Sequence, residues 1–304
     1  MSRTSDSRDQ VRDHDRDQVR DRVPDSARDH DSVYDGLLGT DPTHWAFGTG
    51  FEDPLAGVDT RVASGVDPRE LGALCRGLGD DALVLAHRLS QWCSRAPDLE
   101  TDIAVSNIAL DLLGQARLLL TRAAAADPAL VPEVPGSPAP AEDLLAYFRE
   151  ADMFGSSRLA ALGNADFAQL VVRLLLWSAQ RLAVLTDLTD HADGVVAAVA
   201  AKGVREVTYH RDWSARWVLV LAGGTPESRL RLEDALAAVW PSYGDLLERH
   251  PEAAAGVEDV VTHVLLSAGV ERPHVVVGAD VDDDLPALLA DLQSVARAHP
   301  LGVW

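Results

Sequence analysis

The chain has 304 residues, of which 47% are hydrophobic and 25% are charged, a composition typical of one large globular domain or two small ones. Its formal net charge of -21 argues against binding to nucleic acid or to an anionic membrane surface, because both require clustered lysine and arginine. The N-terminus has no apolar leader, and we expect no membrane span, which needs an apolar run of about 18 residues or more. Two cysteines without C-x-x-C spacing indicate neither a disulfide framework nor a zinc site. We therefore expect a soluble protein of the reducing cytoplasm.

The first 66 residues divide into two segments without a predicted long helix. Residues 1–35 contain ten Asp, seven Arg and a repeated RDQVRD, and almost no large apolar side chains. Such a segment cannot bury enough surface to offset its ordering entropy, so we expect a disordered charged tail, with a short charged docking helix as the alternative. Residues 36–66 are punctuated by Gly and Pro and include Trp45, Phe47 and Phe51. This composition predicts an irregular arm that packs on the chain's own core or on a partner.

A helical domain is predicted over residues 67–304. Its first helix should begin after Asp67, because Asp67 is a good N-cap, Pro68 fits the first helical position and Glu70 completes a capping box. Apolar residues then recur every three or four positions, which marks one buried face. Pro97 should end this helix near residue 95, because a proline ring cannot continue the hydrogen-bond ladder.

Three further long helices are predicted, over residues 98–125, 166–188 and 192–222. The first two of these are apolar around most of their circumference, which is typical of central helices in a bundle. A short helix is expected near residues 142–154, and another begins at Thr225-Pro226, directly after a Gly-Gly pair that ends the preceding helix. A less regular helical region continues to Trp304. Only residues 274–278 resemble a strand, so the fold class is all-α, with extra helices at the C-terminal end.

Two helices that are apolar nearly all round have more surface to bury than four helices can cover. The later helices, the aromatic arm and a partner protein are the candidates to cover it, and a large interface would be apolar and short of charge at its centre. Trp177, Trp213 and Trp217 could serve either the core or such an interface. Their helical spacing favours the core.

Polar residues interrupt the apolar faces of two of the long helices. Asn107, Asp111 and Gly114 share one stripe of the second helix, while Glu206 and His210 of the fourth lie four positions apart and are close enough to touch. A four-helix carboxylate metal protein needs a Glu from each of two helices and a Glu-x-x-His from each of the other two. The four long helices predicted here match the four-helix scaffold of such a protein.

The ligands of such a metal site are mostly missing. The two Glu-x-x-His positions read Asp-Leu-Leu-Gly from Asp111 and Glu-Val-Thr-Tyr from Glu206, and the third long helix has no acidic residue between Asp166 and Asp187. A two-metal site must supply several anionic oxygens to hold two hard cations. We therefore expect Glu206 and His210 to form a hydrogen-bonded core pair, with a mononuclear or adventitious metal site as the alternative.

The other polar residues are also interpreted as structural. Asn107, Asp111 and Gln115 should satisfy each other, Arg117 or backbone groups across the first helical hairpin. The first helix could offer Asp80, Asp81 or His87, and Asp81 with Arg88 is expected to form a similar internal network. The predicted remnant of a metal site, kept as a structural polar core, comprises Asp81, Asn107, Asp111, Gln115, Glu206 and His210. No G-x-G-x-x-G, Walker, G-x-S-x-G or H-E-x-x-H motif is present.

Three long motifs occur in the order LGDDALVLAHRLSQWCSRAPDLE, NIALDLLGQARLLL and VREVTYHRDWSARWVLVLAGG. With them, about residues 70–304 resemble the C subunits of the bacterial phenylacetyl-CoA 1,2-epoxidase, the ring-oxygenase complex of phenylacetate catabolism. The resemblance implies a ferritin-like bundle and a non-catalytic structural subunit that pairs with the homologous di-iron A subunit, the catalytic one. It also implies that this chain holds no cofactor and no metal. The di-iron partner would bind phenylacetyl-CoA and activate oxygen at its iron pair, and a separate reductase would supply electrons from NADPH through flavin and an iron-sulfur cluster.

Two hypotheses of function follow. The first is a structural subunit of a cytoplasmic heteromeric oxygenase, with no nucleic-acid or membrane partner. The second is a stand-alone metal-dependent oxidase on the same fold, with iron held by Asp81, Asp111, Glu206 and His210. The missing carboxylate of the third helix and the glycine at position 114 favour the first hypothesis.

Overall fold

The computed structural model describes residues 53, 55–274 and 284–302, and all of them belong to one compact unit. Every regular element within these residues is a helix, so the predicted all-α class is confirmed. The predicted charged tail, most of the predicted arm and most of the strand-like stretch lie outside the described residues. The described end of the arm, from residue 55 to residue 66, contains turns and no helix.

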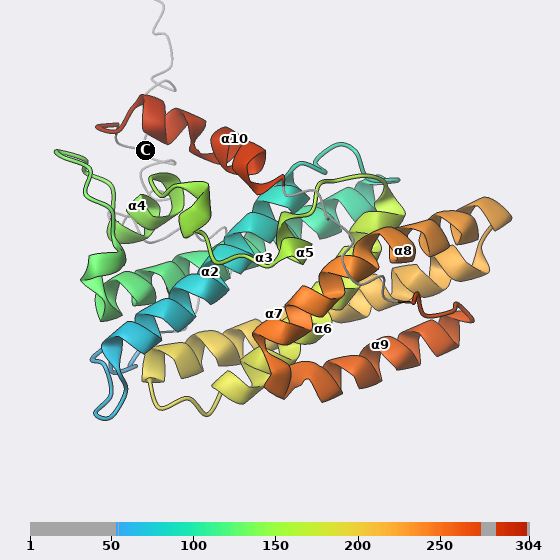
Figure 1. The fold of residues 1–304 in the computed structure, drawn as a ribbon, viewed down its shortest axis with the longest axis horizontal. Coiled ribbons are helices and arrows are strands. Elements are labelled where there is room, and N and C mark those ends of the chain that lie inside the picture. The colour runs from blue at the N-terminus through green and yellow to red at the C-terminus, as the bar shows by residue number, and fades with distance from the viewer. Residues whose placement is uncertain (1–52, 54, 275–283, 303–304) are drawn as a thin grey trace, which may run out of the picture. The chain divides into compact units, whose positions relative to one another are not determined.

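Four long helices form the ferritin-like bundle, as two antiparallel hairpins (Figure 1). They are α2 (Pro68–Ser90), α3 (Leu99–Ala126), α6 (Phe167–Leu188) and α7 (Gly194–Gly223). Each begins after an aspartate whose side chain accepts a hydrogen bond from a backbone N–H of the first turn, as N-caps do. These aspartates are Asp67, Asp98, Asp166 and Asp193. All four predicted long helices are present, with boundaries close to those expected.

The end of α2 differs from the expectation. The helix stops at Ser90 instead of near residue 95, and residues 91–97 form turns. Within these turns Ser94 takes a left-handed backbone conformation, with φ of 66°, and its N–H donates to Asp102 Oδ1 at 2.8 Å. A side-chain acceptor from the next helix therefore replaces the helical hydrogen bonds before Pro97 is reached.

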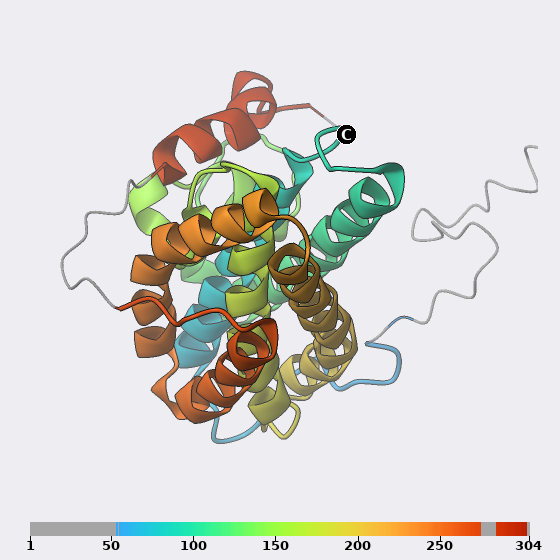
Figure 2. The same cartoon turned by 90° about the vertical axis from the view of Figure 1, so that its right-hand side faces the viewer.

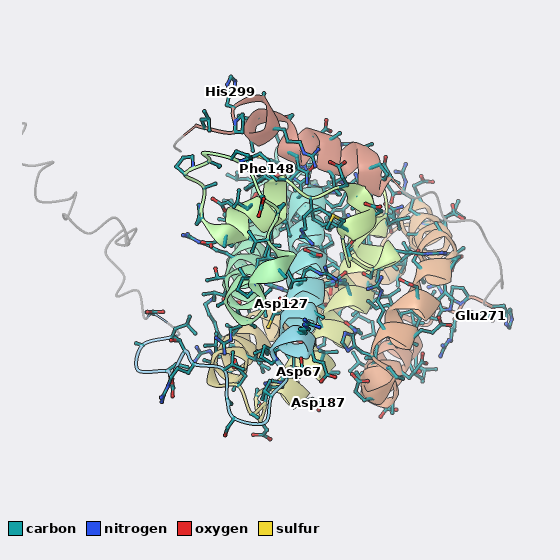
Figure 3. The ribbon with its side chains drawn as sticks, turned by 60° about the vertical axis from the view of Figure 1, so that its left-hand side comes forward. Asp67, Asp127, Phe148, Asp187, Glu271 and His299 are labelled. Carbon is teal, nitrogen blue, oxygen red and sulfur yellow. The ribbon has the colours of Figure 1, made fainter. Side chains whose placement is uncertain are left out.

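Glycines allow α2 and α3 to approach closely. A Cβ added at Gly72 would lie 2.8 Å from Asp127 Cβ, and one added at Gly79 would lie 3.0 Å from the Leu120 side chain. Asp67 and Asp127, labelled in Figure 3, mark the start of α2 and the end of α3 at the same end of this antiparallel pair. The two helices are thus packed closely over the first half of α2.

Further helices surround the bundle. They are α4 (Ala141–Tyr147), α5 (Arg158–Ala161), α8 (Pro226–Arg249), α9 (Ala254–Ala268) and α10 (Leu285–Ala298). Three 3-10 turns complete the described part: η1 (Pro128–Leu130), η2 (Ala151–Met153) and η3 (Pro251–Ala253). The single helix expected near residues 142–154 is therefore divided into α4 and η2. Helices α8 and α9 pack on α6 and α7, whereas α10 lies beside α4 on the opposite side (Figures 1 and 2).

The two most apolar helices differ in how far the bundle covers them. Helices α3 and α6 are each long and apolar enough to cross a membrane by length and composition alone, a test that the core helix of a bundle also passes, so the expectation of no membrane span stays a prediction. Within its most apolar 18 residues α6 is 89% buried, as the core helix of a bundle should be, whereas α3 is only 44% buried. The prediction that both are central is therefore correct for α6 and wrong for α3, because α8 and α9 pack on α6, whereas α4 covers α3 only in part.

The tryptophans of the long helices belong to the core. Trp177 is fully buried, and Trp213 and Trp217 are half-buried against the same core. Phe167 packs edge-on against Trp217 with ring centroids 4.9 Å apart, and it contacts the rings of Trp213 and Trp92 in the same way. Such edge-to-face pairs add to the free energy of area burial and fix the angle between helices.

Candidate functional site

A polar seam lies between α3 and α7, at the height of the two Glu-x-x-His positions. His210 Nε2 and Asp111 Oδ2 are 3.0 Å apart, and one turn away Gln115 Nε2 donates to Glu206 Oε2 at 3.0 Å. The two pairs run in opposite directions along the two helices, as antiparallel packing requires. We call these four residues the α3/α7 seam.

The seam is closed on one side and open on the other. The His210 side chain is 0% exposed, whereas the Asp111 side chain that it contacts is 39% exposed. Glu206 is mostly buried and forms an ion pair with Lys202, one turn earlier on α7. Asp111 therefore connects a buried imidazole to the outer surface of the bundle.

The structure corrects the expected partners of these side chains. Glu206 and His210 do not pair with each other, because each faces a residue of α3 across the seam. Asp111 and Gln115 reach α7 and not the α2 side of the first hairpin, because core packing turns the other side of α3 toward α2. Asn107 is exposed and its side chain makes no hydrogen bond within the described part of the chain, so its assignment to the polar core is wrong.

Asp81 lies in a separate polar group, between α2 and α6. Its carboxylate accepts hydrogen bonds from Ser157 N and Ser157 Oγ, both at 2.7 Å, and from Trp177 Nε1 at 2.6 Å. The expected network with Arg88 is not formed. Arg88 donates instead to the backbone oxygen of Ala161 and to Asp284, which ties α2 to the start of α10.

Two buried ion pairs link the long helices to the segments between them, and the sequence analysis did not predict either pair. Asp80 forms a fully buried pair with Arg149 and also accepts from Gly155 N at 2.9 Å. Arg122 of α3 forms another with Asp193, the N-cap of α7. Adjacent acidic residues on an apolar face of α2 indicated buried acceptors, but the donors lie far along the chain and no local pattern identifies them.

Two arginines of α6 are buried with few partners. Arg173 and Arg181 are almost inaccessible, and burial lowers the pKa of Arg173 to about 9 and that of Arg181 to about 10. Arg181 donates to the backbone oxygen of Leu78 at 3.0 Å, and its positive charge faces Asp81. Such groups are costly to bury, and here they cross-link α6 to neighbouring backbone.

Comparison with known proteins places the chain among relatives. A family model described as "Phenylacetic acid catabolic protein" matches residues 59–304. The chain belongs to this family. It is also 36% identical, over 179 residues, to a protein of Escherichia coli (strain K12) that is named as the C subunit of 1,2-phenylacetyl-CoA epoxidase. That match covers 59% of this chain and 68% of the relative. The resemblance read from the sequence motifs is therefore confirmed.

A di-iron centre does not fit the residues of this family member. Among the described residues, no group of three or more His, Cys, Asp and Glu side chains is placed to hold a metal ion. At the two Glu-x-x-His positions the His slots hold Gly114 and Tyr209, and Tyr209 is exposed. The carboxylates that remain, Asp111 and Glu206, already bind protein donors.

Proposed function

We propose that this chain is a non-catalytic structural subunit of a phenylacetyl-CoA epoxidase. In this proposal it pairs with and stabilises the homologous di-iron subunit, which epoxidises the aromatic ring of phenylacetyl-CoA in aerobic phenylacetate catabolism. Iron belongs to that catalytic subunit, while flavin, an iron-sulfur cluster and NADPH belong to a reductase. The complex is cytoplasmic. The family match, and the relative's name as the C subunit of an epoxidase, support membership of this chain in the epoxidase complex.

The α3/α7 seam is the observation that carries the structural role. In a ferritin-like metal protein these positions would direct carboxylates and imidazoles at metal ions. Here the acidic residues at the two Glu positions, Asp111 and Glu206, contact side chains one position beyond the His slots: Asp111 meets His210, and Glu206 meets Gln115. The seam therefore joins two helices, and a paired buried polar group contributes to holding one arrangement of the bundle.

Reconstitution of the oxygenase tests this proposal. The measured activity is NADPH-dependent epoxidation of phenylacetyl-CoA by the reductase and the catalytic subunit, with and without this chain. We expect activity to depend on this chain, and His210→Gln to retain activity whenever the complex forms, because the imidazole touches no reacting atom. Loss of turnover in a correctly assembled His210→Gln complex, or substrate oxidation by this chain alone, would support the stand-alone oxidase instead.

A further inference from the structure

A hollow of about 220 Å³ opens between α2, α6 and α8, and it shares no residue with the α3/α7 seam. We call it the α2/α6/α8 hollow. Its mouth lies at Ala73 and Arg249, which are exposed. Its floor consists of side chains that are at most 8% exposed: Leu78, Asp81, Gln180, Arg181 and Leu246. The hollow therefore reaches from the surface into the interior of the bundle.

Gln180 is the side chain of this floor that lacks a partner. It is 3% exposed, lines the hollow, and makes no side-chain hydrogen bond within the described part of the chain. Buried amide groups are almost always paired, because leaving one unpaired is costly. The Gln180 amide offers donors and an acceptor side by side to an occupant of the hollow.

The apolar part of the lining suits a small ring. Leu74, Leu78 and Leu246 line the hollow. A Cβ added at Gly77, which lines it as well, would meet nothing within 4 Å, so the space beside α2 is open. An apolar cavity of about 150 Å³ is enough to hold benzene. The volume of about 220 Å³ therefore fits one ring with a short polar substituent.

The charges of the lining favour an uncharged ligand. Arg181 faces Asp81, and Arg249 Nε lies 3.4 Å from Asp245 Oδ2. The Asp81 carboxylate already accepts three hydrogen bonds from protein donors. Because both arginines of the lining face a carboxylate, a ligand ion would enter without a counter-charge of its own, and burying such an ion is costly.

We propose that the α2/α6/α8 hollow binds a small neutral molecule with one ring and a primary carboxamide, or a similar group that combines a donor and an acceptor. The ring contacts the leucines, and the carboxamide pairs with Gln180. This site is independent of the proposed function, because it uses no residue of the α3/α7 seam and needs no partner subunit. A ligand that binds only the folded chain stabilises it, so occupancy raises the Tm.

Benzamide, benzoate and benzylamine test the ligand class, because they share one ring and differ in charge. For benzamide, with about nine non-hydrogen atoms, titration calorimetry on the full chain should give a dissociation constant of about 1 mM or lower. Benzoate and benzylamine should bind at least about tenfold more weakly, since each buries an uncompensated charge. Tighter binding of benzoate would show that the inferred class is wrong. If none of the three binds at about 10 mM, the hollow holds only water and the proposal fails.

Filling the hollow tests the location. Gly77→Leu adds a side chain on the lining, where a Cβ meets nothing within 4 Å, and Gly256→Leu makes the same change on α9, outside the hollow. Circular dichroism should show that both variants fold. We expect Gly77→Leu to weaken benzamide binding by at least about tenfold, and Gly256→Leu to change it less than about twofold. Equal binding by Gly77→Leu and the wild-type chain would place benzamide elsewhere and overturn the site.

Gln180→Met tests the polar contact and separates it from a structural role. Methionine is similar in size and flexible, and it has no amide. Because the amide has no partner in the described part of the chain, its loss should leave the Tm of the unliganded chain unchanged or raise it. Benzamide binding should weaken by at least about tenfold, as loss of a buried hydrogen bond predicts. A lower Tm with unchanged benzamide binding would mean that Gln180 serves the fold, and the inferred contact would be wrong.

Discussion

Replacing Asp111 by leucine tests whether the α3/α7 seam stabilises the fold. The substitution leaves His210 Nε2 without its partner, in a side chain that is 0% exposed. An unsatisfied buried polar group costs about 1–3 kcal/mol, so we expect the free energy of unfolding to fall by about 2 kcal/mol. For a domain of this size that corresponds to a decrease in Tm of roughly 4–8 °C. Urea unfolding followed by circular dichroism measures the change in the free energy of unfolding, and thermal unfolding measures the change in Tm.

A double-mutant cycle identifies the pair as the cause. His210→Leu should cost less than Asp111→Leu, because Asp111 is half exposed and can turn to water while the buried ring nitrogens are removed. In the double variant, Asp111→Leu should add little, which gives a coupling energy of about 1–2 kcal/mol. Asn107→Ala, one turn away and exposed, should change stability by less than about 0.5 kcal/mol. Additive effects of the two substitutions, or no cost of Asp111→Leu, would refute a structural pair.

Three further outcomes are expected from the rest of the molecule. Asp80→Asn breaks the buried pair with Arg149 and should lower the free energy of unfolding by about 3–5 kcal/mol in urea, because it leaves a buried guanidinium uncompensated; a cost under about 1 kcal/mol would contradict this. Burial raises the pKa of the Cys75 thiol to about 12, so at pH 8 a thiol reagent should modify only Cys93 in the native chain and both cysteines in denaturant; two fast native thiols would be inconsistent with this packing. Gly77→Ala should raise stability by about 0.5–1 kcal/mol, because the added methyl meets nothing within 4 Å on a helix; a lower Tm would count against this geometry.

The sequence predicted the helices because their signals are local. Asp67 before Pro68, and Asp98 after Pro97, fix helix starts within a few residues, and the apolar spacing fixes which residues are helical. The end of α2 was misplaced because a side chain from the next helix, Asp102, binds the turn. The local sequence of a helix does not show which residues of another helix it will contact.

The partners in the candidate site could not be predicted for the same reason. Glu206 and His210 are neighbours on one helix, but the choice between each other and Asp111 depends on which helix lies across from α7. Similarly, an apolar pattern predicts burial without naming the covering surface. The pattern of α6 is satisfied within the bundle, and that of α3 is satisfied there only on one side.

The iron content of this chain tests the central claim most directly. The chain should be produced alone in iron-replete medium and also isolated from the assembled oxygenase, and iron per chain should be measured by elemental mass spectrometry. The account predicts about zero iron on this chain in both preparations, with the iron of the complex recovered on the catalytic subunit, because the donor set in the described part of this chain lacks most ligands of a two-metal site. About two irons per chain would contradict it, and would mean that this subunit performs chemistry of its own.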